Sequence, residues 1–124
     1  MFYKKSNIAV IGDGIIDEYY HVEANKISPE FPIPIMNCES LYPYKTLPGG
    51  AANVCYQFNN FEADIQYFGI LDKDAKNIIS NHKINVENCA IINENNCQVP
   101  RKKRFYQDQF PLCRLDIELS LIHI

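Results

Sequence analysis

Two aspartates near the N-terminus have the type and spacing to bind a molecule with several hydroxyl groups. Asp13 and Asp17 follow residues 7–11, an apolar run that predicts a buried strand entering a Gly-Asp-Gly loop. Ligands of open α/β sheets bind beyond the carboxyl ends of the strands, and one carboxylate can accept from two hydroxyls. Asp13 also suits a simple turn, and Asp17 also suits solvation beside Glu18. We rank Asp17 above Asp13 as a ligand.

A diglycine forms the second candidate feature. Gly49 and Gly50 end an extended, proline-rich segment and precede a helix of small residues. Adjacent glycines permit positive φ and leave no Cβ in the way of a bound molecule. The helix that follows presents unpaired N–H groups, and Asn53 in its first turn adds an amide that donates and accepts. Taken alone, the pattern equally fits an ordinary turn before a helix.

A basic run near the C-terminus offers a site for an anion. Strand alternation over 99–106 places Lys102 and Arg104 on one face and Arg101 and Lys103 on the other. Two cations on one face suit a phosphate, and they equally suit a solvated edge that discourages aggregation. In the next predicted strand, 110–118, Arg114 shares a face with an aspartate two residues later, which predicts a local ion pair.

The rest of the chain predicts an α/β fold. One helix is expected over 51–61 with Val54, Phe58 and Phe61 on one side, and a second from about 72 to Asn81. The acidic residues at 72–74 are interpreted as helix caps only. Further strands are predicted at 64–69 and within 84–92.

Residues 19–45 are rich in tyrosine and interrupted by prolines, which forbid a long helix and confine strands to edges. Ile33, Ile35 and Met36 suit a small sheet that stands off the main body, as a lid or a dimer contact. The alternative is a long irregular loop.

Composition limits the classes of protein that remain. A chain of 124 residues suits one domain or part of one, and a formal charge of −3 gives no electrostatic case for binding nucleic acid or an anionic membrane. The N-terminus supports neither a signal peptide nor a membrane span, so a cytoplasmic protein is expected. The five cysteines are odd in number and widely spaced, and we interpret them as reduced and mostly buried.

Five sequence blocks together resemble the N-terminal part of the ribokinase-like (PfkB) carbohydrate kinases. The S-P-E-x-P-x-P block in register before P-G-G-A-A-N is most similar to the D-glycero-β-D-manno-heptose 7-phosphate kinase domain of ADP-heptose synthesis. The resemblance implies a Rossmann-like α/β core with a small β-sheet lid, built from about 18–47 and 98–116 and often used for homodimerisation. The blocks are IGDGIIDEYY, KISPEFPIPI, LPGGAANV, FGILDKDA and CRLDIE.

The resemblance also assigns roles to the candidate residues. Such kinases use ATP and Mg²⁺ to phosphorylate a sugar hydroxyl, here the anomeric O1 of a heptose 7-phosphate. Asp17 and Asn53 would hold sugar hydroxyls, and Gly49 with Gly50 would form the hinge of the lid. The remaining candidates for the substrate site are Lys102 and Arg104, which match a K-x-R pair suited to the 7-phosphate, then Arg114 in the R-[LI]-D stretch, and Asp13.

Part of the family pattern is missing. The G-A-G-D segment that carries the catalytic aspartate does not occur, and the resemblance fades after Glu118. We therefore expect 1–118 to be the N-terminal part of a kinase domain, without the catalytic base or ATP site and inactive alone. Residues 119–124 resemble a translated library adapter and are expected to be a non-native tail. The alternatives are another ribokinase-like sugar kinase and a non-catalytic binding or dimerisation module.

Overall fold

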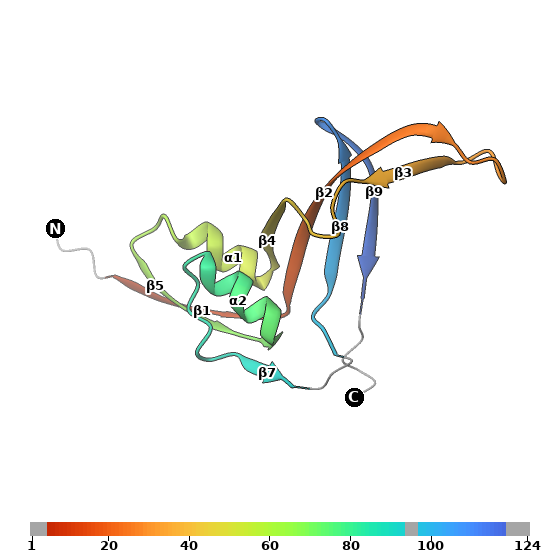
Figure 1. Ribbon diagram of the computed structural model, residues 1–124. Coiled ribbons are helices and arrows are strands. Elements are labelled where there is room, and N and C mark those ends of the chain that lie inside the picture. The colour runs from red at the N-terminus through yellow and green to blue at the C-terminus, as the bar shows by residue number, and fades with distance from the viewer. Residues whose placement is uncertain (1–4, 94–96, 119–124) are drawn as a thin grey trace.

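A computed structural model describes residues 5–93 and 97–118. Strands make up most of the regular structure, and two short helices, α1 and α2, follow diglycine and aspartate turns (Figure 1). The elements in chain order are β1 (Ser6–Ile11), β2 (Gly14–Ile27), β3 (Pro34–Cys38), β4 (Lys45–Gly50), α1 (Ala51–Phe58), β5 (Ala63–Phe68), β6 (Ile70–Asp72), α2 (Lys73–Asn81), β7 (Ala90–Ile92), β8 (Arg101–Gln107) and β9 (Phe110–Ile117).

The core is an α/β layer. Strands β1 and β5 pair in parallel, as do β6 and β7, and α1 packs against β1, β4 and β5. Parallel strands need a long crossover, which the chain between β1 and β5 supplies through the lid and α1. Tyr67 at the end of β5 is buried, and its hydroxyl donates to the carbonyl oxygen of Gly12 at 3.2 Å. The fully buried side chains around it include Ile16, Cys55, Leu71 and Ile79.

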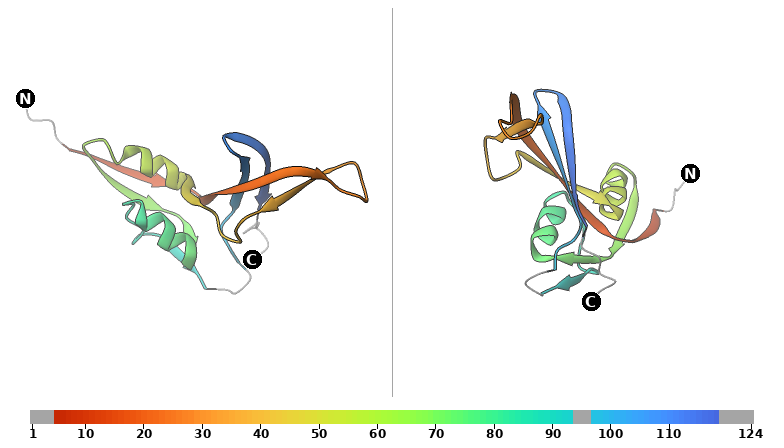
Figure 2. Two further views of the ribbon diagram at one scale, coloured as in Figure 1. Left: turned by 45° about the horizontal axis from the view of Figure 1, so that its top comes forward. Right: turned by 90° about the vertical axis from the view of Figure 1, so that its right-hand side faces the viewer.

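The lid is a sheet organised on β2, which is 14 residues long. The first part of β2 pairs with β4 on one edge and with β8 on the other, and its second part pairs with β3. Strand β9 completes the sheet beside β8. Figures 1 and 2 show β3, β9 and the second part of β2 projecting away from the two helices, whereas β4 lies beside them. The sheet is curved. Its two outermost strands in the order β3-β2-β8-β9 come together, with Cys113 Sγ on β9 only 3.7 Å from Met36 Sδ on β3.

The predicted fold class, an α/β core with a small β-sheet that stands off it, is confirmed. The prediction for the first helix is partly wrong. The helix ends at Phe58, and its buried residues are Ala52 and Cys55, whereas Val54 and Phe61 are 45% and 65% exposed. The small residues face inward because the helix packs closely on neighbouring strands, a contact that large side chains would prevent.

Two further expectations need correction. Asp17 does not follow the end of β1: only Gly12 and Asp13 separate β1 from β2, so Asp17 is the fourth residue of β2. Of the five cysteines, only Cys55 is buried, while Cys38 and Cys113 are exposed on the lid. The expected tail at 119–124 lies outside the described residues. No helix in the described part of the chain has the length and apolarity that a membrane span requires.

Candidate functional site

One face of the lid carries most of the candidate residues. Along β2 the even-numbered residues from Gly14 to Val22 are buried and the odd-numbered ones are more exposed, as the pleat of a half-buried strand requires. Register places side chains of β2, β8 and β9 in two rows on the more exposed face. We call this the Asp17 face. Its first row is Asp17, Lys102 and Asp116, and its second row is Tyr19, Arg104 and Arg114.

Diagonal ion pairs link the two rows. Arg104 Nη1 lies 2.8 Å from Asp17 Oδ1, and the two side chains are only 22% and 20% exposed. Both of these atoms are buried, so water does not reach the contact directly. The adjacent Asp17 carboxylate raises the pKa of Arg104 above its ordinary value. Arg114 binds Asp116 through two contacts of 2.8 and 2.9 Å, which confirms the predicted local pair.

Aromatic side chains frame the cations of the Asp17 face. The Tyr19 ring has Lys45 Nζ 4.9 Å and Arg104 Cζ 5.6 Å from its centroid, distances suited to cation–π attraction. The Tyr106 ring lies beside Tyr19, with 5.9 Å between centroids. A cavity of about 240 Å³ opens next to them and is lined by Arg104, Tyr106 and Arg114, together with 111–113 of β9. Cations and a cavity of this size suit a small anionic group.

The diglycine brings backbone against this face. A Cβ at Gly49 would lie 3.1 Å from Asp17 Oδ2, so the Asp17 side chain rests closely over Gly49. Gly50 has φ 58° and ψ −134° and caps α1. The next amide, that of Ala51, donates to the carbonyl oxygen of Asp13 at 2.9 Å. Asp13 therefore fixes the loop through its backbone, and its side chain is exposed.

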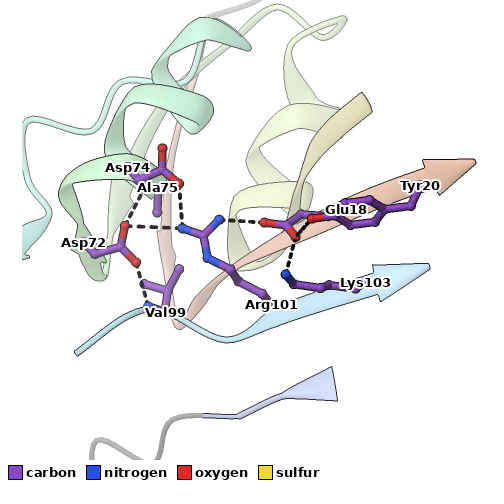
Figure 3. A network of polar contacts seen from close by, with 8 residues as sticks. All are labelled: Glu18, Tyr20, Asp72, Asp74, Ala75, Val99, Arg101 and Lys103. Carbon is purple, nitrogen blue, oxygen red and sulfur yellow. Dashed lines mark hydrogen bonds and ion pairs between the residues drawn. The ribbon is translucent and has the colours of Figure 1, made fainter. Parts of the chain in front are cut away.

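The opposite face of the lid is joined to the core by a charge network (Figure 3). Arg101 is 8% exposed and binds Glu18 Oε1 at 2.8 Å and Asp74 Oδ2 at 2.7 Å. Asp72 caps α2 by accepting from Ala75 N at 2.7 Å, and its other oxygen accepts from Val99 N at 2.8 Å. The acidic residues at 72–74 therefore do more than cap a helix.

Burial and pairing act in opposite directions on Glu18. Burial alone raises the pKa of Glu18, but hydrogen bonds from Arg101 and Tyr20 and the charge of Lys103 outweigh it and leave the pKa below its usual value. Burial, followed by the hydrogen bond to Glu18, raises the pKa of Tyr20 to about 12. Glu18 is therefore held ionised and Tyr20 neutral at neutral pH.

The raised Tyr20 pKa predicts a loss of stability in alkali. Because the folded-state pKa of about 12 exceeds the ordinary value of 10, the contribution of Tyr20 is complete below pH 10 and declines as pH rises through 12. We expect the free energy of unfolding of the unmodified chain to fall more steeply over this range than that of Tyr20→Phe. Urea denaturation at a series of pH values measures both, and parallel curves would contradict the assignment.

Comparison with known proteins identifies relatives of this chain in sequence and in fold. No protein-family model matches the chain. Bifunctional protein HldE of Coxiella burnetii is 32% identical over 98% of this chain, and that of Aliarcobacter butzleri is 31% identical over 95%; each match covers 25% of the relative. Arabidopsis thaliana ribokinase, solved with ribose and ATP, matches 94% of this chain with a TM-score of 0.63 at 15% identity, over 36% of its own length. The chain is a ribokinase-fold relative of HldE. It spans about a quarter of the length of those HldE proteins.

The structure brings several predicted site residues of this HldE relative together and leaves one apart. Asp17, Lys102, Arg104 and Arg114 share one face of the lid, with Gly49 against Asp17. Asn53 is exposed on α1, where its amide oxygen accepts from Gln57 Nε2 at 3.3 Å. This hydrogen bond lies within α1 rather than on the Asp17 face, and the role of Asn53 as a sugar ligand stays a prediction.

Sequence reasoning missed two parts of the site in this HldE relative. One is the aromatic frame of Tyr19 and Tyr106, which strand alignment alone brings together. The other is the Arg101 network, in which Glu18 and Arg101 are 83 positions apart in sequence. The cations at 101–104 and the acidic residues at 72–74 indicated in the sequence that opposite charges could pair. Only the register of β2 against β8 shows which of these charges meet.

Proposed function

We propose that this chain is the N-terminal, sugar-binding part of an ATP-dependent kinase that phosphorylates D-glycero-β-D-manno-heptose 7-phosphate at O1, a step in the synthesis of ADP-heptose for lipopolysaccharide core. The HldE relatives and the ribokinase fold support a sugar kinase of this type. One observation carries the choice of substrate: the Asp17 carboxylate lies in the same small area as three cations. A carboxylate suits hydroxyls, and arginine forks suit phosphate.

Under this proposal, Asp17 accepts from sugar hydroxyls, with Gly49 allowing close approach of the sugar to the backbone. Lys102, Arg104 and Arg114 hold the phosphate that the substrate already carries. Closure of the lid over the sugar would exclude water, so that the sugar rather than water receives the new phosphoryl group.

We propose that ATP and Mg²⁺ serve the longer protein and that the 124-residue chain binds neither and is inactive alone. The described residues hold no group of three His, Cys, Asp or Glu arranged for a metal ion. When bound, ATP with Mg²⁺ would supply the phosphoryl group.

We also propose a cytoplasmic location and homodimerisation through the lid. Support for the dimer comes from β9, the outer strand beside β8, which leaves one backbone edge unpaired in the described sheet. Phe110 and Leu115 on this strand are 73% and 51% exposed, and such an edge favours pairing with a second chain.

Calorimetric titration with heptose 7-phosphate and with unphosphorylated heptose tests the function. Asp17→Asn should weaken both about 10- to 100-fold, because hydrogen bonds to a charged acceptor contribute about 1.5–3 kcal/mol. Lys102→Met should weaken only the phosphorylated sugar, since no other described residue forms an ion pair with Lys102. Asp64→Asn and Lys26→Met, both at exposed strand positions outside the Asp17 face, serve as matched controls.

Three outcomes would redirect the proposal. Unchanged affinities in Asp17→Asn would refute the sugar site. Equal losses for both sugars in Lys102→Met would instead favour a ribokinase-like kinase that does not select phosphorylated substrates. A monodisperse chain that ignores both sugars would favour the non-catalytic module.

A further inference from the structure

The group proposed to bind sugar hydroxyls is already engaged within the protein. Asp17 Oδ1 lies 2.8 Å from Arg104 Nη1, and Asp17 Oδ2 lies over Gly49, where a Cβ would stand only 3.1 Å away. A sugar that approaches Asp17 therefore meets a carboxylate whose charge is partly neutralised by Arg104. Asp17 Oδ1 is also buried, so the ion pair must loosen before a hydroxyl group can reach this oxygen.

The cations and the cavity next to Arg104 would allow it to bind another anion in place of Asp17. Arg114 stands directly opposite it on β9, and Lys102 precedes it by two residues on the same face of β8. The cavity of about 240 Å³ is lined by both arginines. Like charges directly opposite each other on a sheet repel, and an anion between them relieves that repulsion.

A phosphate group is a stronger partner for Arg104 than Asp17 is. Phosphate carries up to two negative charges and three acceptor oxygens, which match the fork of a guanidinium, whereas Asp17 carries one charge. The Tyr19 ring, 5.6 Å from Arg104 Cζ, can support the guanidinium in either position.

We propose that Arg104 is a specificity-determining residue that couples recognition of the phosphate group to recognition of the sugar hydroxyls. Without phosphate, Arg104 stays paired with Asp17 and keeps this carboxylate from binding the sugar. When a phosphate group binds Arg104, the ion pair opens and the freed Asp17 carboxylate accepts the sugar hydroxyls. This inference rests on the proposed function, because it needs Asp17 to be the sugar ligand. It goes beyond a simple phosphate contact, since it makes the affinity for hydroxyls depend on phosphate. A sugar without a phosphate group would have to break the ion pair unaided.

Titration of unphosphorylated heptose with and without inorganic phosphate, at constant ionic strength, tests the coupling. In the unmodified chain, saturating phosphate should raise the affinity for heptose about five-fold or more, the lower range of typical coupling between sites. Arg104→Met should bind heptose more tightly than the unmodified chain does without phosphate, and added phosphate should then have no effect.

Lys26→Met is the matched control, because Lys26 is an exposed cation on β2 outside the Asp17 face. It should leave both the affinity for heptose and the effect of phosphate on that affinity unchanged. Heptose affinity that is independent of phosphate in the unmodified chain would overturn the coupling, and so would a loss of heptose binding in Arg104→Met.

Binding of heptose 7-phosphate separates this failure from failure of the proposed function. If the unmodified chain binds heptose 7-phosphate but shows no coupling between heptose and phosphate, only the masking role of Arg104 is overturned. If the unmodified chain binds neither sugar, both the proposed sugar site and the proposed coupling are refuted.

Discussion

Replacing Arg101 with leucine is expected to lower the free energy of unfolding by about 3–5 kcal/mol, because it strands a buried carboxylate. The Glu18 side chain is 7% exposed and its closest cation is Arg101, at 2.8 Å. Lys103 remains, but its Nζ lies 3.6 Å from Glu18 and its side chain is 29% exposed. Urea denaturation followed by circular dichroism measures the loss.

Two further variants test whether the loss of stability in Arg101→Leu comes from the unpaired charge of Glu18 or from poorer packing. Lys103→Met removes the more exposed cation of the same carboxylate and should cost less than about 1 kcal/mol, as exposed ion pairs do. Adding Glu18→Leu to Arg101→Leu removes the stranded charge, so it should recover most of the loss. A single Arg101→Leu variant within about 1 kcal/mol of the unmodified chain would show that water reaches Glu18 readily.

The Arg101 network matters for the site on the other face of the sheet. Arg101 begins β8 and joins β2, through Glu18, to the start of α2, through Asp74 (Figure 3). Because side chains alternate across a strand, fixing Arg101 and Glu18 on one face also fixes Lys102 and Asp17 on the other. The core thereby sets the register of the candidate substrate face.

Local patterns were sufficient to predict parts of this arrangement. Alternation separated Lys102 and Arg104 from Arg101 and Lys103, and the structure confirms these two faces. The two-residue spacing of Arg114 and its aspartate predicted their ion pair, which is observed. Both predictions needed only the period of a strand, which neighbouring residues determine.

The pairing of segments that are far apart in the sequence could not be predicted from the sequence pattern. The parallel register of β2 against β8 decides that Asp17 meets Arg104 and that Glu18 meets Arg101, and a shift by one residue would exchange the faces. The tyrosines and prolines of 19–45 predicted extended structure but did not show that β2 is one long strand shared by several partners. The buried face of α1 was mispredicted because large apolar residues outweighed small ones in the pattern.

Gly50→Ala is expected to destabilise the chain through its backbone, by about 1–3 kcal/mol from the strained φ and ψ alone. Gly50 has φ 58° and ψ −134°, and a Cβ there would lie 2.6 Å from the carbonyl oxygen of Asp13, which is backbone and cannot rotate away. The same carbonyl accepts from the Ala51 amide, so a shift also disturbs the start of α1. Urea denaturation should therefore show a loss at or above the upper part of that range.

Gly49→Ala is the matched comparison. It is expected to cost little stability and to weaken sugar binding strongly. The new methyl group would meet the Asp17 side chain at 3.1 Å, and that side chain can turn aside, so the cost in stability should stay below about 1 kcal/mol. Turning Asp17 aside moves the carboxylate that is proposed to bind the sugar, so affinity for heptose 7-phosphate should fall about ten-fold or more. If Gly49→Ala bound this sugar as well as the unmodified chain does, the close approach of Asp17 to the diglycine would have no part in sugar recognition. If Gly50→Ala were as stable as Gly49→Ala, the positive φ at the helix cap would not constrain this loop.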